Sequence, residues 1–356
     1  MIESLYYNIH DLVKIKINRP KHSDWLKDVN LRFSYFQTGA VENPDIIVNI
    51  GKFAPKNKDC EVIDHKFFVK KNYLYCRDAE KSAKWEIEIN GFEEGKTIVN
   101  FNGRILGLQQ ILTPDLLFQQ YFLRTLIELK LFQKNAVLSH AAGIAKNNKG
   151  ILFAGRGSAF KTSITADFVK RGWSFLGEDF VIIRKGKVLS FPAAVMEYFF
   201  RMTCLPSEEL RREHYLQDLL AWFNFLRKNQ NYKKLDLKIA NASPINSIYF
   251  IERTNSQGIK IKKNLKKSTC VKKLVLNHEL EFTMTNMQTI HLSGMYNYLL
   301  AYSFVFPFSK TANFWDWLAG FYSKTISAVP CHLIEIPFKY DSNVFNKLSD
   351  LILKGE

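Results

Sequence analysis

The 356-residue sequence has few cysteines and none in a paired motif. No C-x-x-C pair is present, and the five cysteines are widely spaced: Cys60, Cys76, Cys204, Cys270 and Cys331. This pattern favours neither a disulfide framework nor a zinc site. We expect buried free thiols.

Long hydrophobic runs are also absent. No stretch approaches 18 uninterrupted apolar residues, so we expect no membrane span and no membrane partner. The start of the chain, MIESLYYNIHDLVKIKI, lacks the basic and apolar regions of a signal peptide, which predicts a cytoplasmic protein. The composition, 47% hydrophobic and 24% charged, is that of a globular chain long enough for one large domain or two ordinary ones.

Acidic residues are scarce relative to basic ones, which leaves a net charge of +16. Such a charge attracts polyanions, including nucleotides, acidic peptides and nucleic acid. The lysines are nevertheless spread along the chain, with one cluster at 262–267 and at Lys272-Lys273. No helix-turn-helix, zinc finger or RNP motif accompanies them, so a lysine-rich solvated surface is favoured over a nucleic-acid partner.

The pattern of residues predicts two domains. Residues 1–112 alternate β-branched and aromatic residues between Asn-Gly and Glu-Gly turns, which predicts a mostly antiparallel β unit. Residues 113–356 follow, beginning with a helix for which Thr113 is the N-cap and Pro114 the first residue. A strongly amphipathic segment predicts a helical insertion at about 206–235.

The second domain alternates strands and helices, typical of an α/β or α+β fold. We expect strands at 136–146, 150–155, 173–184, 246–253 and 331–338, and helices at about 161–171, 291–304, 312–329 and 342–353. The two helical stretches at 291–304 and 312–329 are rich in aromatic residues.

The segment GRGSAFKTS, residues 155–163, stands between a predicted buried strand and a predicted helix. It has the length and ending of the phosphate-binding loop G-x-x-x-x-G-K-[ST]. In such a loop the backbone N–H groups and the helix N-terminus bind phosphate, Lys161 reaches the β- and γ-phosphates, and Thr162 binds magnesium. The predicted nucleotide-binding residues are Gly155, Arg156, Gly157, Ser158, Ala159, Phe160, Lys161, Thr162 and Ser163. A glycine-containing strand–helix turn with a surface lysine remains the alternative.

Phe160 stands where the loop pattern has glycine. A phenylalanine there is costly unless its φ is ordinary and its ring points into the sheet. We predict that the ring packs against the sheet or the helix, away from the phosphates.

Three further residues are candidates for the same site. His140 lies in the strand before the loop, among small residues, where it can exchange a proton near neutral pH. Glu178 and Asp179 are expected in mid-strand in an apolar segment, pointing to opposite faces. One carboxylate near magnesium and another that accepts a hydroxyl proton would serve phosphoryl transfer. The alternatives are a hydrogen-bonded core histidine and two solvated acids at a strand end.

The region 136–192 as a whole resembles the HPr kinase/phosphorylase superfamily, in its branch of HPr-kinase-related proteins that do not act on HPr. The likeness rests on the strand with His140, the loop 155–162, Arg171-Gly172 at the helix end and the acids Glu178-Asp179. It is fainter over 246–253 and 324–338, and it does not cover the first 110 residues.

The resemblance implies a P-loop core akin to phosphoenolpyruvate carboxykinases, with ATP or GTP and Mg²⁺. It implies that Lys161 holds phosphates, that Thr162 and Glu178 bind Mg²⁺, and that Asp179 is the catalytic base, assisted by His140. Ser158 and Phe160 depart from family glycines and Glu178 from the usual Asp. The basic loop of the HPr-specific enzymes is absent, so HPr is not the expected substrate.

The sequence therefore predicts a Mg²⁺- and ATP-dependent kinase that phosphorylates a serine-type hydroxyl of a peptide or small molecule. The alternative is a catalytically weakened module that binds nucleotide or peptide in a biosynthetic complex. Nucleotide preference, acceptor and homo-oligomer formation stay open.

Overall fold

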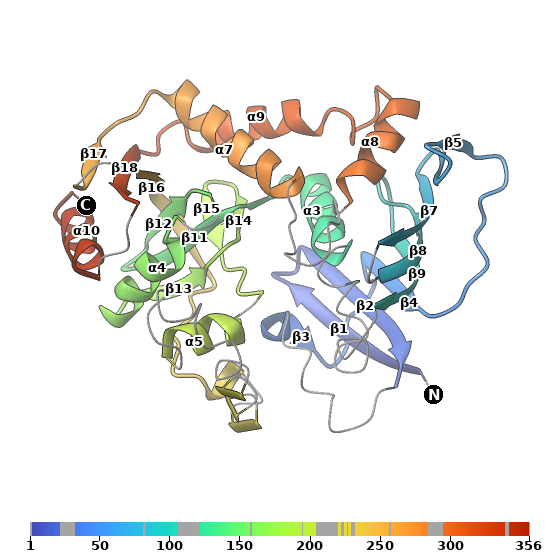
Figure 1. Cartoon of the computed structure of the whole chain (residues 1–356), viewed down its shortest axis with the longest axis horizontal. Helices are drawn as coiled ribbons and strands as arrows, with labels where there is room; N and C mark the ends of the chain where they lie inside the picture. The colour runs from blue at the N-terminus through green and yellow to red at the C-terminus, as the bar shows by residue number, and fades with distance from the viewer. Residues whose placement is uncertain are drawn as a thin grey trace. The chain divides into compact units, whose positions relative to one another are not determined.

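The computed structural model is a mixed α/β protein with two large mixed sheets (Figure 1). The structure describes residues 2–21, 33–80, 83–105, 118, 122–156, 159–193, 195–203, 220–221, 224–225, 227–228, 232–255, 258–283, 295–338 and 342–355. Within these residues, no helix has the length and apolar character that crossing a membrane requires.

The chain forms two compact units, each built from two stretches of sequence. The first comprises Met1–Val137 and Glu279–Leu318, and the second Leu138–His278 and Ala319–Glu356. The predicted domain boundary at residues 112/113 lies outside the described residues. The first unit also includes Glu279–Leu318, which the prediction assigned to the second domain, residues 113–356.

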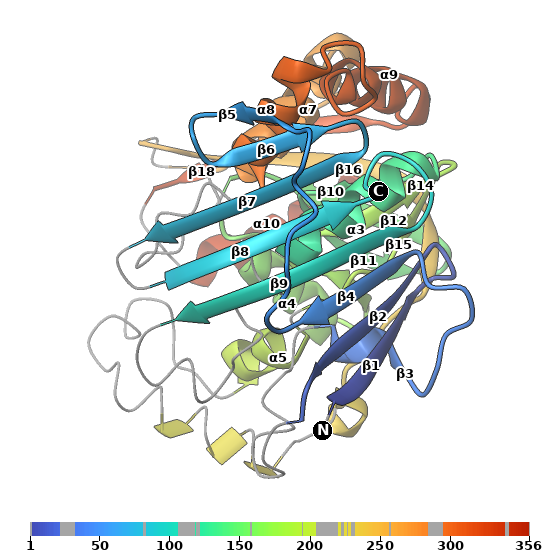
Figure 2. The same cartoon turned by 90° about the vertical axis from the view of Figure 1, so that its right-hand side faces the viewer.

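The first unit contains a nine-stranded sheet in the order β3-β1-β2-β4-β9-β8-β7-β6-β5, which faces the viewer in Figure 2. Its strands are β1 Ile2–Ile9, β2 Val13–Pro20, β3 Gln37–Thr38, β4 Ile46–Ile50, β5 Glu61–Ile63, β6 Phe67–Lys70, β7 Tyr73–Glu80, β8 Ala83–Asn90 and β9 Thr97–Ile105. Strand β4 runs parallel to both its neighbours, β2 and β9. The other recorded strand pairs of this sheet are antiparallel.

A row of polar side chains crosses this sheet and is consistent with its register. Asn18 donates to Asn49 at 2.8 Å, Asn49 to Asn100 at 3.0 Å, and Asn100 to Glu88 at 2.7 Å. These residues stand directly opposite one another on β2, β4, β9 and β8. A slip of one residue would turn each of them to the other face of the sheet, so the row opposes it.

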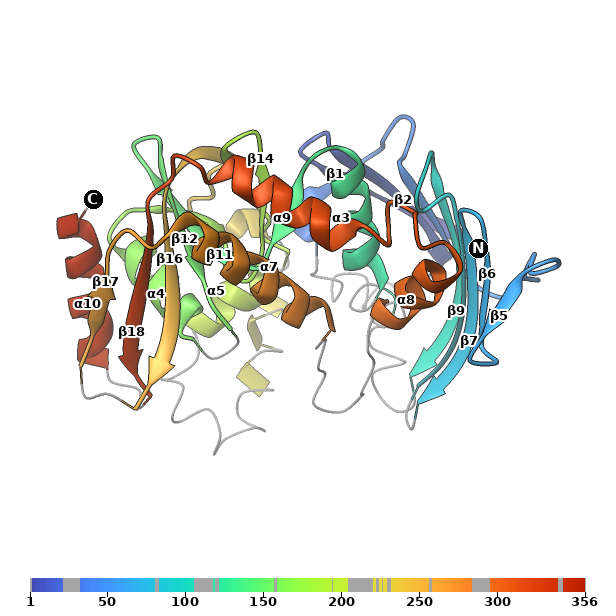
Figure 3. The ribbon, with the colours of Figure 1, turned by 90° about the horizontal axis from the view of Figure 1, so that it is seen from above.

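Helices α3, Arg124–Gln133, and α8, Tyr296–Val305, cover one face of the same sheet (Figure 3). Two tyrosines join α8 to the strands. The indole of Trp85 donates to Tyr298 at 2.7 Å, and the backbone N–H of Asn72 donates to Tyr302 at 3.0 Å. Burial raises the pKa of Tyr298 well above its ordinary value, so this hydroxyl stays neutral.

The second unit contains another nine-stranded sheet, with the main order β10-β14-β15-β16-β12-β11-β13 and with β18 and β17 beyond β16. Its strands are β10 Val137–Ser139, β11 Ala141–Lys146, β12 Lys149–Ala154, β13 Ser174–Gly177, β14 Val181–Arg184, β15 Lys187–Leu189, β16 Ala242–Thr254, β17 Lys260–Lys262 and β18 Cys331–Pro337. Strands β12, β16 and β18 are parallel neighbours, so their carboxyl ends meet at one edge.

Helices α4, Lys161–Lys170, and α10, Ser342–Gly355, pack on this sheet and on each other. Their apolar side chains join those of β11, β12, β16 and β18 in one buried cluster, which includes Ile151, Phe168 and Leu348. Helix α4 ends at Lys170, and Gly172 follows two residues later with a φ of +80°, which a residue without a side chain adopts readily.

Several predicted elements differ in detail from the structure. The strand expected at 136–146 is divided into β10 and β11 at His140, and the strand expected at 173–184 is divided into β13 and β14. Helices α5, Val195–Thr203, and α7, Lys267–Thr283, were not predicted. The remaining helix is α9, Phe314–Thr325. Most of the predicted insertion at 206–235 lies outside the described residues.

Candidate functional site

The predicted site residues gather at one edge of the second unit's sheet. Strand β12 ends at Ala154, and the antiparallel register places Ala141 of β11 opposite it. His140 directly precedes β11 and Gly155 directly follows β12, so the two residues lie at the same edge. Strand β13 runs antiparallel to β11 and ends at Gly177, so Glu178 leaves the sheet at that edge too.

Gly155 is required by a close approach of two backbones. A Cβ atom at this position would lie 2.7 Å from the carbonyl oxygen of Ile251 and 3.2 Å from the Cβ atom of Ala159. The end of β12 can thus approach β16 only without a side chain. This accounts for Gly155 whether or not the loop binds phosphate.

Lys161, the first residue of α4, is buried, with only 4% of its surface exposed. Its ammonium donates to the carbonyl oxygen of Gly155 at 2.8 Å and to that of Arg156 at 3.3 Å. It also lies 3.4 Å from Nε2 of His140. An ammonium group can only donate, so this contact needs the lone pair of a neutral imidazole on Nε2.

Phe160 precedes Lys161 with φ +58° and ψ 22°, the left-handed region. Its φ is therefore not ordinary, so one of the two conditions under which a phenylalanine here avoids a cost is not met. This conformation costs a non-glycine residue about 1–2 kcal/mol, which explains why the loop pattern has glycine here. The ring is 7% exposed and joins the buried cluster with Ile164 of α4 and Ile251 of β16, so its predicted packing against sheet and helix is confirmed.

Arg253 lies between two aromatic rings at the carboxyl ends of the parallel strands. Its guanidinium carbon is 4.4 Å from the ring centroid of Phe160 and 4.3 Å from that of Phe338, and it donates to the Phe338 carbonyl oxygen. These distances are those of cation–π contacts. The sequence gives no local signal for this arrangement, because the three residues come from β16, the loop and the segment after β18.

Asn277 on α7 holds two parts of the site together. Its side-chain amide donates to the backbone carbonyl oxygen of His140 at 2.7 Å. Its backbone carbonyl oxygen accepts from the guanidinium of Arg156 at 3.3 Å. Asn277 was not among the predicted residues. The helix that carries it went unrecognised because its first turns read as a lysine cluster rather than an apolar periodicity.

The two acids do not stand in mid-strand as predicted. Glu178 and Asp179 occupy the bend between β13 and β14. The bend is tight, since a Cβ atom on Gly177 would lie 2.1 Å from the carbonyl oxygen of Phe180. Glu178 is buried and Asp179 exposed, so the pair still points into two environments, through a turn rather than strand alternation.

The surroundings of Glu178 and His140 are partly aromatic. The phenol of Tyr198 on α5 is buried, and this burial, with the charge of Glu178 second, raises the pKa of Tyr198. The ring of Phe180 lies 5.4 Å from that of His140. Glu178 and His140 thus lie near apolar rings.

The remaining loop residues are placed in part. Ala159 is buried, while Thr162 and Ser163, in the first turn of α4, are half-buried. Gly157 and Ser158 lie outside the described residues. No three His, Cys, Asp or Glu side chains cluster as metal ligands in the part of the chain that the structure describes. Mg²⁺ prefers oxygen ligands, and the side chains of Thr162 and Glu178, the predicted Mg²⁺ ligands, both end in oxygen.

Comparisons with known proteins give little beyond this geometry. No family model matches the chain, and no curated protein sequence matches it. Among solved structures, it is similar to the Hpr(Ser) kinase/phosphatase from Coxiella burnetii, with 8% identity over 61% of this chain and 95% of that chain and a TM-score of 0.24. A TM-score this low carries no argument about fold or activity.

Proposed function

We propose that the protein is a Mg²⁺-dependent phosphotransferase that moves the γ-phosphoryl group of ATP to a serine-type hydroxyl of a peptide or small molecule. The observation that carries this proposal is the position of Lys161. Its ammonium lies at the strand-to-helix loop 155–161, within 3.4 Å of His140 and on the first turn of α4. A lysine, a helix N-terminus and a nearby imidazole are what an anionic phosphate chain needs.

Each residue has a distinct task in the proposed reaction. Lys161 and the loop amides would hold the phosphates, and Thr162 with Glu178 would hold Mg²⁺, which when bound would neutralise charge on the phosphate oxygens. The acceptor oxygen attacks the γ-phosphorus, the bond from phosphorus to the β–γ bridging oxygen breaks, and ADP leaves. Asp179 takes the acceptor's proton, a task that suits an exposed carboxylate beside the buried Glu178.

Nucleotide binding would require one rearrangement. The Lys161 ammonium is engaged with the carbonyl oxygens of Gly155 and Arg156. To bind phosphate it must exchange these partners for phosphate oxygens, which form stronger charge-assisted hydrogen bonds. The long, flexible lysine side chain allows this without movement of α4.

One observation favours the alternative, a module in which the fold persists and phosphate binding is weak. Phe160 replaces the glycine of the pattern, and its left-handed backbone is held by a buried ring. A loop anchored in this way is less free to curl around phosphates. The two functions differ in whether Lys161-dependent nucleotide binding occurs.

Calorimetry with Mg²⁺ and ATP, GTP or ADP tests the proposal. The wild type and the control Lys170→Ala, an exposed lysine at the far end of α4, are expected to bind, while Lys161→Ala is not. Asp179→Asn is expected to bind ATP without transferring phosphate to serine-containing peptides. If the wild type binds none of the three nucleotides, the phosphotransferase proposal is refuted and the binding module takes its place.

A further inference from the structure

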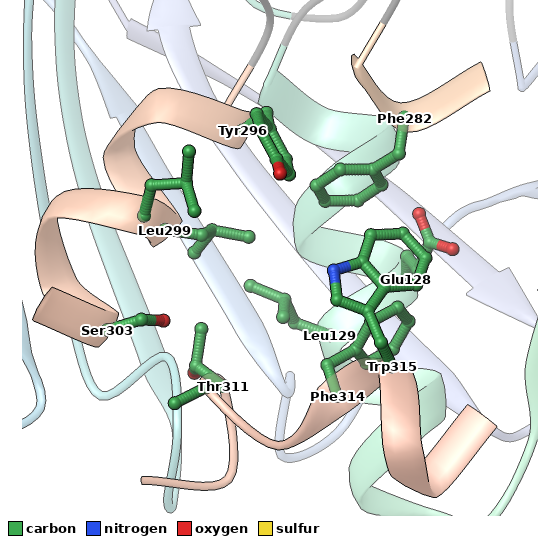
Figure 4. Close-up of a pocket in the computed structure, with 11 residues that line it drawn as sticks. Glu128, Leu129, Phe282, Tyr296, Leu299, Ser303, Thr311, Phe314 and Trp315 are labelled. Atoms are coloured by element: carbon green, nitrogen blue, oxygen red, sulfur yellow. The ribbon is translucent and has the colours of Figure 1, made fainter. Parts of the chain in front are cut away.

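A cavity of about 90 Å³ lies in the first unit, lined by residues of α3, α8, the end of α7 and the start of α9 (Figure 4). It is separate from the phosphate loop, which belongs to the second unit. Its volume is roughly three times one water molecule's share of the liquid, enough for a compact group of a few heavy atoms.

Four aromatic residues line this cavity: Phe282, Tyr296, Phe314 and Trp315. Three ring pairs meet at steep interplanar angles, 89° for Phe282 and Trp315, 79° for Phe282 and Tyr296 and 73° for Phe314 and Trp315, while Phe282 and Phe314 are inclined by 31°. Rings arranged in this way present several π faces and edges to one small space. Leu129 and Leu299 close the opposite side (Figure 4).

One acidic residue also lines the cavity. Glu128 of α3 is 6% exposed, and Figure 4 shows it on the side where Phe282 and Trp315 stand. Aromatic faces attract cations through the ring quadrupole, most strongly where water is excluded. A carboxylate near the same faces adds a negative potential that a neutral ligand cannot use.

We propose that this cavity binds a methylated or otherwise compact organic ammonium group. The apolar walls accommodate the carbon substituents on nitrogen, the aromatic rings and Glu128 attract its charge, and the volume admits the head group alone. Leu300, 48% exposed, lies at the wall of the cavity and is placed to border its mouth. The rest of the ligand would pass over it into solvent. This site does not depend on nucleotide binding by the second unit.

Choline and its uncharged isostere 3,3-dimethylbutan-1-ol provide the test, with binding followed by calorimetry and tryptophan fluorescence on the full chain without nucleotide. The two compounds have the same shape, so their difference reports charge. We expect choline to bind at least about tenfold more tightly, since only the charged compound gains cation–π attraction from the desolvated aromatic rings. Equal affinity for both compounds, or no binding of choline, would overturn the proposal.

Variants locate the binding. Glu128→Gln is expected to weaken choline binding about tenfold and to leave the alcohol unaffected. Leu300→Trp, at a half-exposed position that tolerates a larger side chain, is expected to block both compounds. Phe308→Ala, at an almost fully exposed position that does not line the cavity, is the control and should bind as the wild type does. If Glu128→Gln does not fold, Leu300→Trp decides, and choline binding that survives it would refute the site.

Discussion

The guanidinium carbon of Arg253 lies 4.4 Å from the centre of the Phe160 ring, and Phe338 packs on the same guanidinium at 4.3 Å. Phe160 is therefore held from two directions, by the buried cluster and by a charged group. The contacts of its ring offset the cost of a left-handed backbone at this position. The residue that breaks the glycine pattern has become part of the core.

The variants Phe160→Gly and Phe160→Ala should separate the stabilisation by the ring contacts from the cost of the left-handed backbone. Both variants lose the buried ring, which costs about 3–5 kcal/mol for Phe→Ala in a core. The glycine variant also loses the left-handed penalty, so it should be about 1 kcal/mol more stable than the alanine variant, measured by urea unfolding.

This order reverses the usual one, because glycine is elsewhere about 0.5–1 kcal/mol less favourable than alanine. An alanine variant as stable as the glycine variant, or more so, would show that φ is not positive in solution. Phe160→Gly also restores the loop pattern, so under the proposed function its affinity for Mg²⁺-ATP should equal or exceed that of the wild type.

Two glycines of the second unit differ in the space around them, and alanine should affect them in opposite ways. Gly155→Ala places a Cβ atom 2.7 Å from a backbone oxygen that cannot move away independently of β16. We expect a loss of about 1–3 kcal/mol, as for other overpacked sites. Gly320→Ala is the matched control. Gly320 lies inside α9 with no atom within 4 Å of the added Cβ, so alanine should stabilise by about 0.5–1 kcal/mol.

Thermal unfolding of the two variants would show shifts of opposite sign. A Gly155→Ala protein as stable as the wild type would mean that β12 and β16 separate easily, and that Gly155 is not required by their close approach.

Local pattern was enough to predict the surroundings of the loop. Strand β12, helix α4 and the termination of α4 just before Gly172 follow from an apolar run, a helical periodicity and one glycine, all contained in a short stretch of chain. Between β11 and β12 the chain turns at Asn147 and Asn148, both at positive φ. Such residues suit a two-residue hairpin turn.

The remaining parts depend on contacts between distant segments, which one sequence does not reveal. Asn277 and Arg253 contact the loop although they lie about a hundred positions from it in the sequence. The bend at Glu178 was read as a strand because its flanking residues are apolar. The tight Gly177–Phe180 turn that interrupts it has no strong turn dipeptide of its own.

Asn277 is predicted to stabilise the site from α7. Its amide is the donor for the carbonyl oxygen of His140, and both residues are buried. Asn277→Ala leaves that oxygen without this donor, which costs about 1–3 kcal/mol. Leu276→Ala, at an exposed neighbouring position of the same helix, should change stability by less than about 0.5 kcal/mol. Equal effects of the two substitutions would remove Asn277 from the site.

The last prediction concerns alkaline pH and the buried thiol of Cys76. Burial raises the pKa of Cys76 to about 12, from an ordinary value of 9.0. Below pH 9 the thiol is protonated in both the folded and the unfolded chain, and its contribution to stability is fully present. Between pH 9 and 12 the unfolded chain loses this proton while the folded chain keeps it. Stability therefore falls as pH rises, by up to about 1.4 kcal/mol per pH unit for this group.

The contribution is isolated by comparing the wild type with Cys76→Ala in urea unfolding at pH 8 and pH 10.5. The variant loses a small buried group at both values, but its stability should decrease less between them. Buried tyrosines that do not interact with Cys76, such as Tyr198, titrate in the same direction in both proteins and cancel in the difference. An equal loss of stability between pH 8 and pH 10.5 in the two proteins would mean that water reaches the Cys76 thiol. Native Cys76 should then also react with iodoacetamide at pH 8, where a thiol with a pKa near 12 is almost entirely unreactive.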